Sequence, residues 1–509
     1  MSSSTAFRTS VSELGGGRIL ILILLFALAI YQFITAGFSA FATVCSLPII
    51  VLVMILAFKK HIYVFWTLII LNSFLQWHSL SLPAGIPMSL YNEGLEFLLI
   101  ALAIIDAKEY HFDRCANLML FSLVIWCIFC TLEVLNNTCG LGVDIAAWYQ
   151  GTRMIALQML YAFIVFSLYI NTPNVLIRYL FIWGAITLFA SFWVWKQSNI
   201  GFTHAEELWL NGPGRVTHII QGGSLIRYYS IYSDAANFGI GIASTAVAFI
   251  IFGITNKILK YKIFFFITGA AAAWATFPSG TRTAIACLIA GFMAYVFLSK
   301  SVKIAVPVTI LFGLFVFILA FTDIGQGNQQ IRRMRSAFDK NDASANVREI
   351  NQEAMRKYMK EAPWGLGVGL YNTNIPANNK YFFVVNTPSD SEYVSIWVRT
   401  GKIGLIVFLV TTAIMLIGAC IIVLFRLKSP SLRGIGAGLC CAFVSQQLGG
   451  YGNMVLMQFP NCLIFYGGLT IVYILPIMEN EWIKFEEKKL AVQKEKKLLR
   501  LKKKETSRV

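Results

Sequence analysis

The chain has 509 residues, of which 57% are hydrophobic and only 13% are charged, and its mean hydropathy is +0.67. A soluble protein would carry about 25% charged residues, so a soluble globular fold is excluded. In so apolar a chain, the net charge of +17 indicates topology and contact with anionic lipid rather than nucleic acid. The histidines and cysteines show no metal-ligand spacing, and the C-x-x-C at Cys127 and Cys130 lies inside an apolar run. We therefore expect no metal, no cofactor and no disulfide framework.

The long apolar runs match the roughly 20 residues that a helix needs to cross a bilayer. Hydropathy predicts an all-α, polytopic membrane protein with about fourteen transmembrane helices. They are expected near residues 19–36, 39–57, 62–77, 91–106, 116–134, 153–170, 177–195, 235–254, 262–278, 283–299, 304–321, 403–425, 434–450 and 455–476.

Lysine and arginine residues concentrate in alternate short connections between these spans, for example at Lys59, Lys257 and Lys428. The positive-inside rule assigns that side and both termini to the cytoplasm. The predicted organisation is a cytoplasmic N-terminus (1–18), transmembrane helices 1–11 with an outer segment at 196–234 (19–321), an outer, periplasmic loop with amphipathic helices (322–402), transmembrane helices 12–14 (403–476) and a basic cytoplasmic helical tail (477–509). The tail is expected to rest on anionic lipid, with a partner-binding role as the alternative.

The outer loop is polar although it lies between membrane spans. Residues 346–361 read N-V-R-E-I-N-Q-E-A-M-R-K-Y-M-K-E, and their less polar members, which include Val347 and Ile350, recur at helical spacing. This pattern predicts an amphipathic helix. A Pro-Trp pair and the glycines Gly365, Gly367 and Gly369 follow, and they predict a tight turn with a close backbone approach.

Two carboxylates stand where the outer loop enters the next helix. Asp390 is placed to act as a general base toward a sugar hydroxyl. The alternative is that Ser389 or Asp390 simply caps the N-terminus of that helix. Glu392 is expected to be a solvated acid in its first turn, where the helix dipole favours a negative charge.

Arginines stand at the predicted outer ends of membrane spans: Arg153, Arg227, Arg282 and Arg399. A charge at membrane depth is costly and is usually retained for function. Because guanidinium binds phosphate through a planar fork of donors, several converging arginines would suit a lipid-linked pyrophosphate. The alternative is that each one snorkels to the interface. Arg282 fits that alternative least, because P-S-G-T-R-T breaks the helical pattern around it.

Four motifs, spread over roughly residues 150–425, resemble the O-antigen polymerase/ligase superfamily of the Wzy and WaaL type. R-E-I-N-Q-E-A-M-R-K-Y-M-K-E-A-P-W-G-L-G-V-G-L-Y resembles its outer-loop signature, in which an arginine opens a helix that ends in Pro and a G-x-G turn. T-R-T-A at 281–284 resembles its S-R-x-A element. The third and fourth motifs are R-Y-Y-S-I-Y-S-D-A-A-N-F-G and D-S-E-Y-V-S-I-W-V-R-T-G-K-I-G.

The resemblance implies a GT-C-like, metal-independent, inverting glycosyltransferase at the outer leaflet of the bacterial inner membrane. It implies transfer of a glycan from undecaprenyl pyrophosphate to an acceptor hydroxyl. Asp390, Arg282 and Arg227 are the expected catalytic residues. The expected substrate-binding residues are Arg153, Arg215, Arg348, Asn237, Tyr393, Gly367 and Gly369. The expected partners are the lipid-linked glycan donor and acceptor, membrane lipids, a flippase and a chain-length regulator.

One departure from the family separates the possible acceptors. The family's ligases usually carry His where this chain has Asp390, and no His occurs in 323–402. We therefore favour a polymerase that joins repeat units of O-antigen, capsule or exopolysaccharide. The alternative is a ligase that transfers the glycan to lipid A core or to a protein. A flippase or other transporter is a more distant alternative, because no inverted repeat is visible.

Overall fold

The computed structural model describes residues 59–80, 88–220, 225–327, 329–335 and 343–506. The chain forms two compact units, Met1–Trp66 and Thr67–Val509, and the features below belong to the second. Its helices are α3 (Ile62–Phe74, shared with the first unit), α4 (Met88–Ile105), α5 (Leu118–Leu132), α6 (Ile145–Thr152), α7 (Gln158–Tyr169), α8 (Pro173–Asn199), α9 (His204–Asn211), α10 (Arg215–His218), α11 (Ala235–Thr255), α12 (Leu259–Ala275), α13 (Arg282–Leu298), α14 (Val302–Phe321), α15 (Gln329–Arg335), α16 (Ala343–Met359), α17 (Phe382–Asn386), α18 (Glu392–Ile421), α19 (Pro430–Gly452) and α20 (Asn461–Thr506). Two short strands, β1 (Ile219–Ile220) and β2 (Leu225–Ile226), pair antiparallel.

The helices confirm the predicted class of an all-α membrane protein. Among the described residues, six helical segments are long and apolar enough to cross a bilayer: Leu118–Leu135, Ile145–Tyr169, Pro173–Asn199, Ala235–Thr255, Glu392–Arg426 and Asn461–Glu495. Three shorter apolar helices accompany them: Ile62–Phe74, Arg282–Leu298 and Thr309–Phe321. The predicted spans 19–36 and 39–57 lie outside the described residues, so the count of fourteen stays a prediction.

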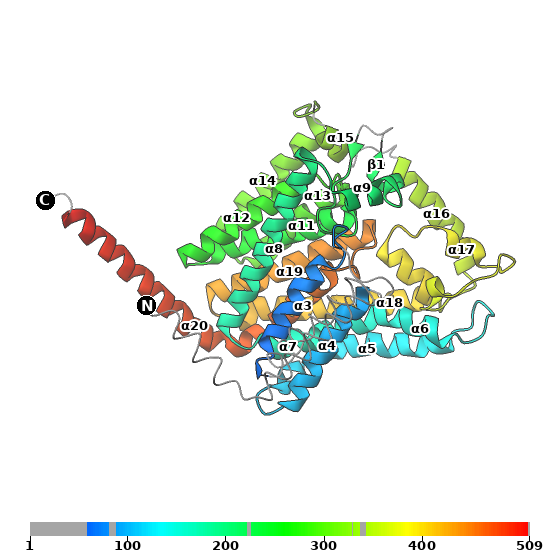
Figure 1. Ribbon diagram of the computed structural model, residues 1–509, viewed down its shortest axis with the longest axis horizontal. Helices are drawn as coiled ribbons and strands as arrows, with labels where there is room; N and C mark the ends of the chain where they lie inside the picture. Colours follow the sequence, from blue (N-terminus) through cyan, green and yellow to red (C-terminus); the bar gives the residue numbers. More distant parts are fainter. Residues whose placement is uncertain (1–58, 81–87, 221–224, 328, 336–342, 507–509) are drawn as a thin grey trace, which may run out of the picture. The chain divides into compact units, whose positions relative to one another are not determined.

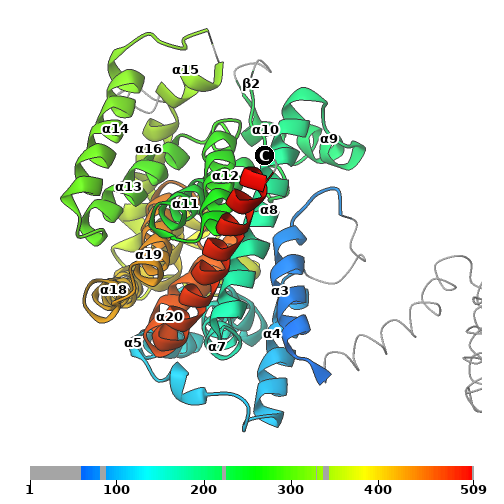
Figure 2. The same ribbon diagram turned by 90° about the vertical axis from the view of Figure 1, so that its left-hand side faces the viewer.

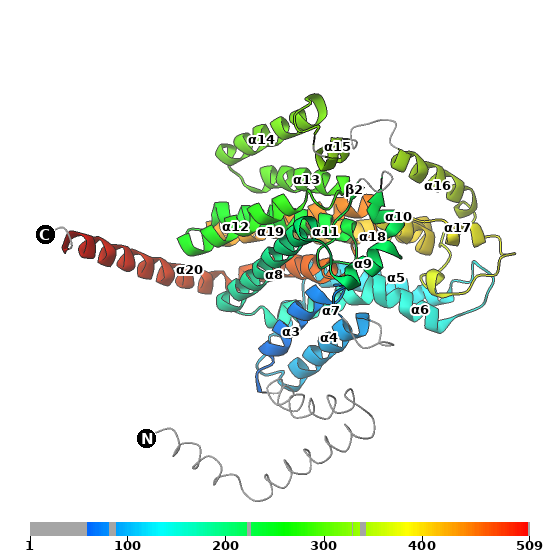
Figure 3. The ribbon, with the colours of Figure 1, turned by 45° about the horizontal axis from the view of Figure 1, so that its top comes forward.

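Helix α11 packs against α12, α13 and α19 (Figure 3), and nearly all its side chains are buried. Small residues let α19 approach it closely. A Cβ at Gly434 would overlap the Thr255 hydroxyl, and one at Gly438 would lie 2.5 Å from the ring of Phe252. Close approach through small residues is the usual way in which membrane helices gain packing energy.

Helix α18 begins at Glu392, which confirms the prediction that this residue lies in its first turn, and it continues into the predicted membrane span 403–425. It packs against α5 and α19 (Figure 2). Its backbone is broken at Gly401, which has φ 69°. Such a φ is accessible to glycine at little cost, so the sequence T-G-K permits the break. The N-terminal part of α18 therefore belongs with the outer loop, and only the remainder continues as a regular apolar helix.

The last predicted span, 455–476, starts later than expected, because residues 453–460 form a loop and α20 begins at Asn461. Helix α20 then continues without interruption for 46 residues, which corresponds to about 69 Å. The predicted basic tail is thus the continuation of a membrane helix (Figure 1). A helix that leaves the bilayer in this way would carry its basic residues away from the lipid surface, and contact of the tail with anionic lipid stays a prediction.

The outer loop has a hydrophobic core of its own. Met355 and Met359 of α16 pack with Leu366, Leu370, Ile375, Tyr381, Val384 and with Val398 of α18. Helix α16 thereby confirms the predicted amphipathic helix. Two of its predicted apolar-face members were placed wrongly, since Val347 and Ile350 are 53% and 64% exposed. The core lies under the C-terminal half of α16 and fixes this half to α18.

Candidate functional site

The side chain of Arg227 joins the nearby segment at Thr217 to the turn at 279–281, which is distant in the sequence. Its Nη1 donates to the Thr217 carbonyl at 3.0 Å, its Nη2 to Thr281 Oγ1 at 2.9 Å and its Nε to the Ser279 carbonyl at 3.4 Å. The backbone around it is equally constrained, because Arg227 N–H donates to the His218 carbonyl. Neutral acceptors thus hold the guanidinium in place without cancelling its charge.

The turn before α13 brings a second arginine to this position. Gly280 adopts φ +57°, and its carbonyl accepts a hydrogen bond from Arg333 Nε at 2.7 Å. A Cβ at this glycine would lie 3.1 Å from Arg227 Cγ and 3.5 Å from Arg333 Cδ. The P-S-G-T turn, which the sequence indicated as a break in the helix, therefore lies between two arginines.

Two further arginines lie near enough to act on the charge of Arg227. Burial lowers the pKa of Arg227 to about 10, and three positive charges act in the same direction: Arg333, Arg282 and Arg348. Among the described residues, the carboxylate of Asp234 acts in the opposite direction and raises this pKa. We call Arg227, Arg282, Arg333 and Arg348 the arginine cluster. Like charges gathered in this way destabilise one another, and a bound anion relieves the repulsion.

The opposing carboxylate is largely engaged elsewhere. Asp234 Oδ1 accepts from the backbone N–H groups of Ala236 and Asn237 at 2.8 and 2.9 Å, so Asp234 caps the N-terminus of α11. Its Oδ2 accepts from the Ser233 hydroxyl at 2.8 Å. These bonds use the carboxylate as a helix cap.

His218, which the sequence analysis did not select, is bonded to the backbone on both sides of the cluster. It is 2% exposed, and its Nε2 accepts from the Ala235 N–H at 2.9 Å. The proton of the neutral ring must then sit on Nδ1, which faces the Gly214 carbonyl at 3.2 Å. Burial and the charge of Arg227 lower the pKa of His218 to about 4. A neutral histidine thus joins the start of α11 to the segment that carries Arg227.

The loop 453–460 connects the cluster to the start of α18. Asn453 Nδ2 donates to Thr283 Oγ1 at 3.3 Å, beside Arg282. At the other side, Ser389 Oγ lies 3.2 Å from Met454 Sδ. Glu392 Oε2 accepts from the Leu456 N–H at 3.0 Å. The expectation that Glu392 is solvated was wrong: the side chain is 4% exposed, because it binds this loop.

Asp390 lies between Ser389 and Glu392, which both contact the loop 453–460. It has φ +48°, a left-handed conformation that Asp tolerates better than most residues, and its side chain is exposed. The capping alternative was wrong, because the N-cap of α18 is Ser391, whose side chain makes no capping bond. The carboxylate of Asp390 is therefore free of a structural role in the helix and faces solvent.

The glycine turn 365–369 fits into the break of α18. Leu366 and Gly367 N–H groups donate to the carbonyls of Val398 and Arg399 at 2.9 and 2.8 Å. A Cβ at Gly369 would lie 2.6 Å from the Ala147 carbonyl carbon of α6, whereas one at Gly367, with φ +101°, would meet open space. These contacts confirm the predicted tight turn with a close backbone approach.

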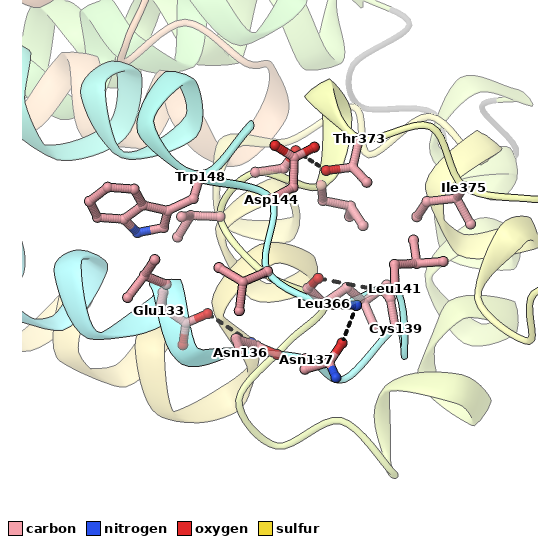
Figure 4. Close-up of a pocket in the computed structure, with 17 residues that line it drawn as sticks. Glu133, Asn136, Asn137, Cys139, Leu141, Asp144, Trp148, Leu366, Thr373 and Ile375 are labelled. Atoms are coloured by element: carbon pink, nitrogen blue, oxygen red, sulfur yellow. Dashed lines mark hydrogen bonds between the residues drawn. The ribbon is translucent and has the colours of Figure 1, made fainter. Parts of the chain in front are cut away.

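A small pocket lies between this glycine turn and residues 133–148 (Figure 4). Several polar groups of residues 133–148 form hydrogen bonds with one another. Asn136 Nδ2 donates to Glu133 Oε2 at 2.8 Å, and the Gly142 N–H donates to Asn137 Oδ1 at 2.9 Å. None of the residues that line the pocket belongs to the arginine cluster.

The remaining predicted site residues lie apart from the cluster or are used for packing. Arg153 Nε lies 3.3 Å from Glu93 Oε1 in a buried ion pair, and Arg215 is exposed at the start of α10. Asn237 is fully buried and donates to the Phe459 carbonyl at 2.7 Å. Tyr393 donates to the Gln447 carbonyl at 2.9 Å. Direct contact of these residues with a substrate stays a prediction.

The fold and this site define a helical membrane protein that gathers four arginines at one end of its helices. Residues 264–409 match the family model described as O-antigen ligase, which confirms the predicted resemblance to the O-antigen polymerase/ligase superfamily. No curated protein matches the chain. The matched range includes Arg282, Arg333, Arg348 and Asp390, while Arg227 lies outside it. Among the described residues, no three His, Cys, Asp or Glu side chains lie close enough to hold a metal ion.

Proposed function

We propose that this protein transfers a glycan from undecaprenyl pyrophosphate to a hydroxyl acceptor at the outer face of the bacterial inner membrane. The observation that carries the proposal is the arginine cluster, in which four guanidinium groups lie close enough together to suit a diphosphate. Four arginines supply many donors in planar forks, the geometry that phosphate oxygens accept. The family match supports a lipid-linked glycan as the substrate.

In the proposed reaction, an acceptor hydroxyl oxygen forms a bond to the anomeric carbon of the donor sugar. The bond from that carbon to the pyrophosphate oxygen breaks, and its electron pair leaves with the pyrophosphate. The arginine cluster stabilises the charge that develops on this leaving group, and such stabilisation usually lowers the barrier more than any other effect. Asp390 accepts the hydroxyl proton as general base, and attack opposite the leaving group inverts the anomeric configuration.

We favour a polymerase, in which the acceptor is the terminal sugar of another lipid-linked repeat unit. Asp390 stands where a His is usual in the ligases that this chain resembles. A ligase is the second candidate, because the matched family model bears that description. The two candidates use the same arginine cluster and differ only in the acceptor.

The test is a reconstitution of the full-length protein in lipid nanodiscs with an undecaprenyl-pyrophosphate-linked repeat unit. A polymerase lengthens the glycan in steps of one repeat without any other acceptor. A ligase leaves the glycan unchanged until lipid A core is added, and then attaches it there. Absence of transfer in both arms, from a preparation that binds the lipid-linked substrate, would refute the glycosyltransferase proposal.

A further inference from the structure

A cavity of about 290 Å³ lies among the ends of three helices, at the opposite end of these helices from the arginine cluster. It is bounded by the C-terminal ends of α11 and α13 and by the first turns of α19. The same helices α11 and α13 begin beside Arg227 and at Arg282. Helix α11 has 21 residues, which span about 31 Å, close to the hydrocarbon thickness of a bilayer. The cavity and the cluster therefore lie at opposite membrane faces.

The wall of the cavity is amphipathic. Its polar part includes Arg433 and the hydroxyl residues Ser299 and Ser301, and its apolar side includes Ile254 and Leu298. Arg433 lies in the first turn of α19, where the helix dipole also favours an anion. Among the residues that the structure describes, its guanidinium has no hydrogen-bond or ion-pair partner. A charge at the edge of a membrane is costly without a counter-ion.

Within the described part of the chain, the carboxylates of the same end of the bundle have other partners. Glu479 Oε1 accepts from the backbone N–H groups of Lys428 and Ser429 at 2.7 Å each. Glu486 lies 3.9 Å from Lys257 Nζ. The same end of the bundle carries further cations in its connections, among them Lys300 and Lys303. The positive-inside rule assigns this end to the cytoplasm, where the leaflet is anionic.

We propose that this cavity binds the phosphate of an anionic phospholipid from the cytoplasmic leaflet. Arg433 pairs with the phosphate, and the hydroxyl of Ser301 donates to a headgroup oxygen. The acyl chains lie along the apolar wall at Ile254 and Leu298. A free phosphate has the same charge chemistry but would leave that wall exposed to water, which makes a lipid the better occupant.

The test measures the thermal midpoint (Tm) of the full-length protein in neutral detergent, with added phosphatidylglycerol, phosphatidylcholine or glycerol 3-phosphate. We expect phosphatidylglycerol alone to raise Tm, as expected for a ligand that binds only the folded state. In Arg433→Gln the rise should fall by at least half. Ser301→Glu, which adds a negative charge to the cavity, should have the same effect. Lys303→Gln, an exposed cation of the same end outside the cavity, should keep the full rise.

Three results would overturn the proposal. An equal rise with phosphatidylcholine would show that headgroup charge is irrelevant, and an equal rise with glycerol 3-phosphate would indicate a free-anion site. An unchanged rise in both Arg433→Gln and Ser301→Glu would place the lipid elsewhere. Because the readout is lipid-dependent stability, these results are independent of whether the protein transfers a glycan.

Discussion

The arginine cluster and the glycine turn were both indicated by sequence motifs, but they differ in how their polar and charged groups are paired. In the glycine turn, backbone groups bond to the broken helix α18 and a glycine fills the space against α6. In the cluster, neutral carbonyls and hydroxyls position the guanidinium of Arg227 while four like charges remain close together. The glycine turn pairs its polar groups with one another, whereas the cluster brings like charges together, and such arrangements are frequent at functional sites.

The largest expected effect is a loss of glycan transfer when the arginine cluster is changed. Arg227→Ala should lower glycan transfer by about 1000-fold, because it removes donors from the developing charge on the leaving pyrophosphate. Expression and Tm should stay near those of the wild type, because the change also relieves repulsion among the arginines. The measurement is turnover of the lipid-linked substrate by purified protein. Arg356→Ala, an exposed arginine on α16, is the matched control and should keep full activity. Comparable losses in the two variants would remove the distinction between cluster and surface.

The second prediction concerns the base. Asp390→Asn should lower kcat by about 100-fold with little change in KM, because Asn cannot accept the hydroxyl proton. Asp390→His should recover most of the rate, since imidazole can serve as a base. Glu353→Gln, an exposed carboxylate of the same outer layer, is the control. If Asp390→Asn retained wild-type kcat, the general base would have to be another group.

The third prediction turns to the glycine turn, where stability rather than chemistry should change. Gly369→Ala should lower the stability of the fold by about 3 kcal/mol, since its Cβ meets the backbone of α6 with no flexible atom to yield. Gly367→Ala meets no neighbour but must adopt φ +101°, so a smaller cost of about 1 kcal/mol is expected. Thermal unfolding in detergent compares the two. A larger loss at Gly367 would mean that strain, not space, selects glycine in this turn.

The last prediction concerns the pH dependence of stability that arises from His218. An unfolded histidine has a pKa of about 6.5, while burial and Arg227 hold the pKa of His218 at about 4. The unfolded state therefore takes up the proton first, so the stability from neutral His218 is complete above pH 6.5 and is lost as the pH falls toward 4. Over that interval the wild-type Tm should fall by roughly 3 °C more than that of His218→Gln. Parallel curves would show that the ring does not titrate with unfolding.

Regions whose contacts are local in the sequence could be predicted, whereas regions whose contacts join distant segments could not. The glycine turn and α16 are local, so spacing and glycine content sufficed to predict them. Arg227 and Arg282 could be selected because charges near membrane spans are rare, and Arg348 because it opens the helix in the outer-loop motif. Arg333 was one of three similar arginines in I-R-R-M-R, and only the carbonyl of Gly280 distinguishes it. Glu392 was misjudged because a first-turn acid is solvated by default, and the loop that covers it is 64 residues away in sequence at Leu456.

The sequence by itself determined the membrane class, the amphipathic helix α16, the glycine turn and the resemblance to the O-antigen polymerase/ligase superfamily. These depend on hydropathy and on spacing within short segments, which act before the chain is folded. Only the tertiary structure decided which arginines meet, that Arg153 pairs with Glu93, and that a neutral histidine supports Arg227. Those outcomes depend on contacts between helices far apart in the chain, where burial and like-charge repulsion are set by the packing of the whole bundle.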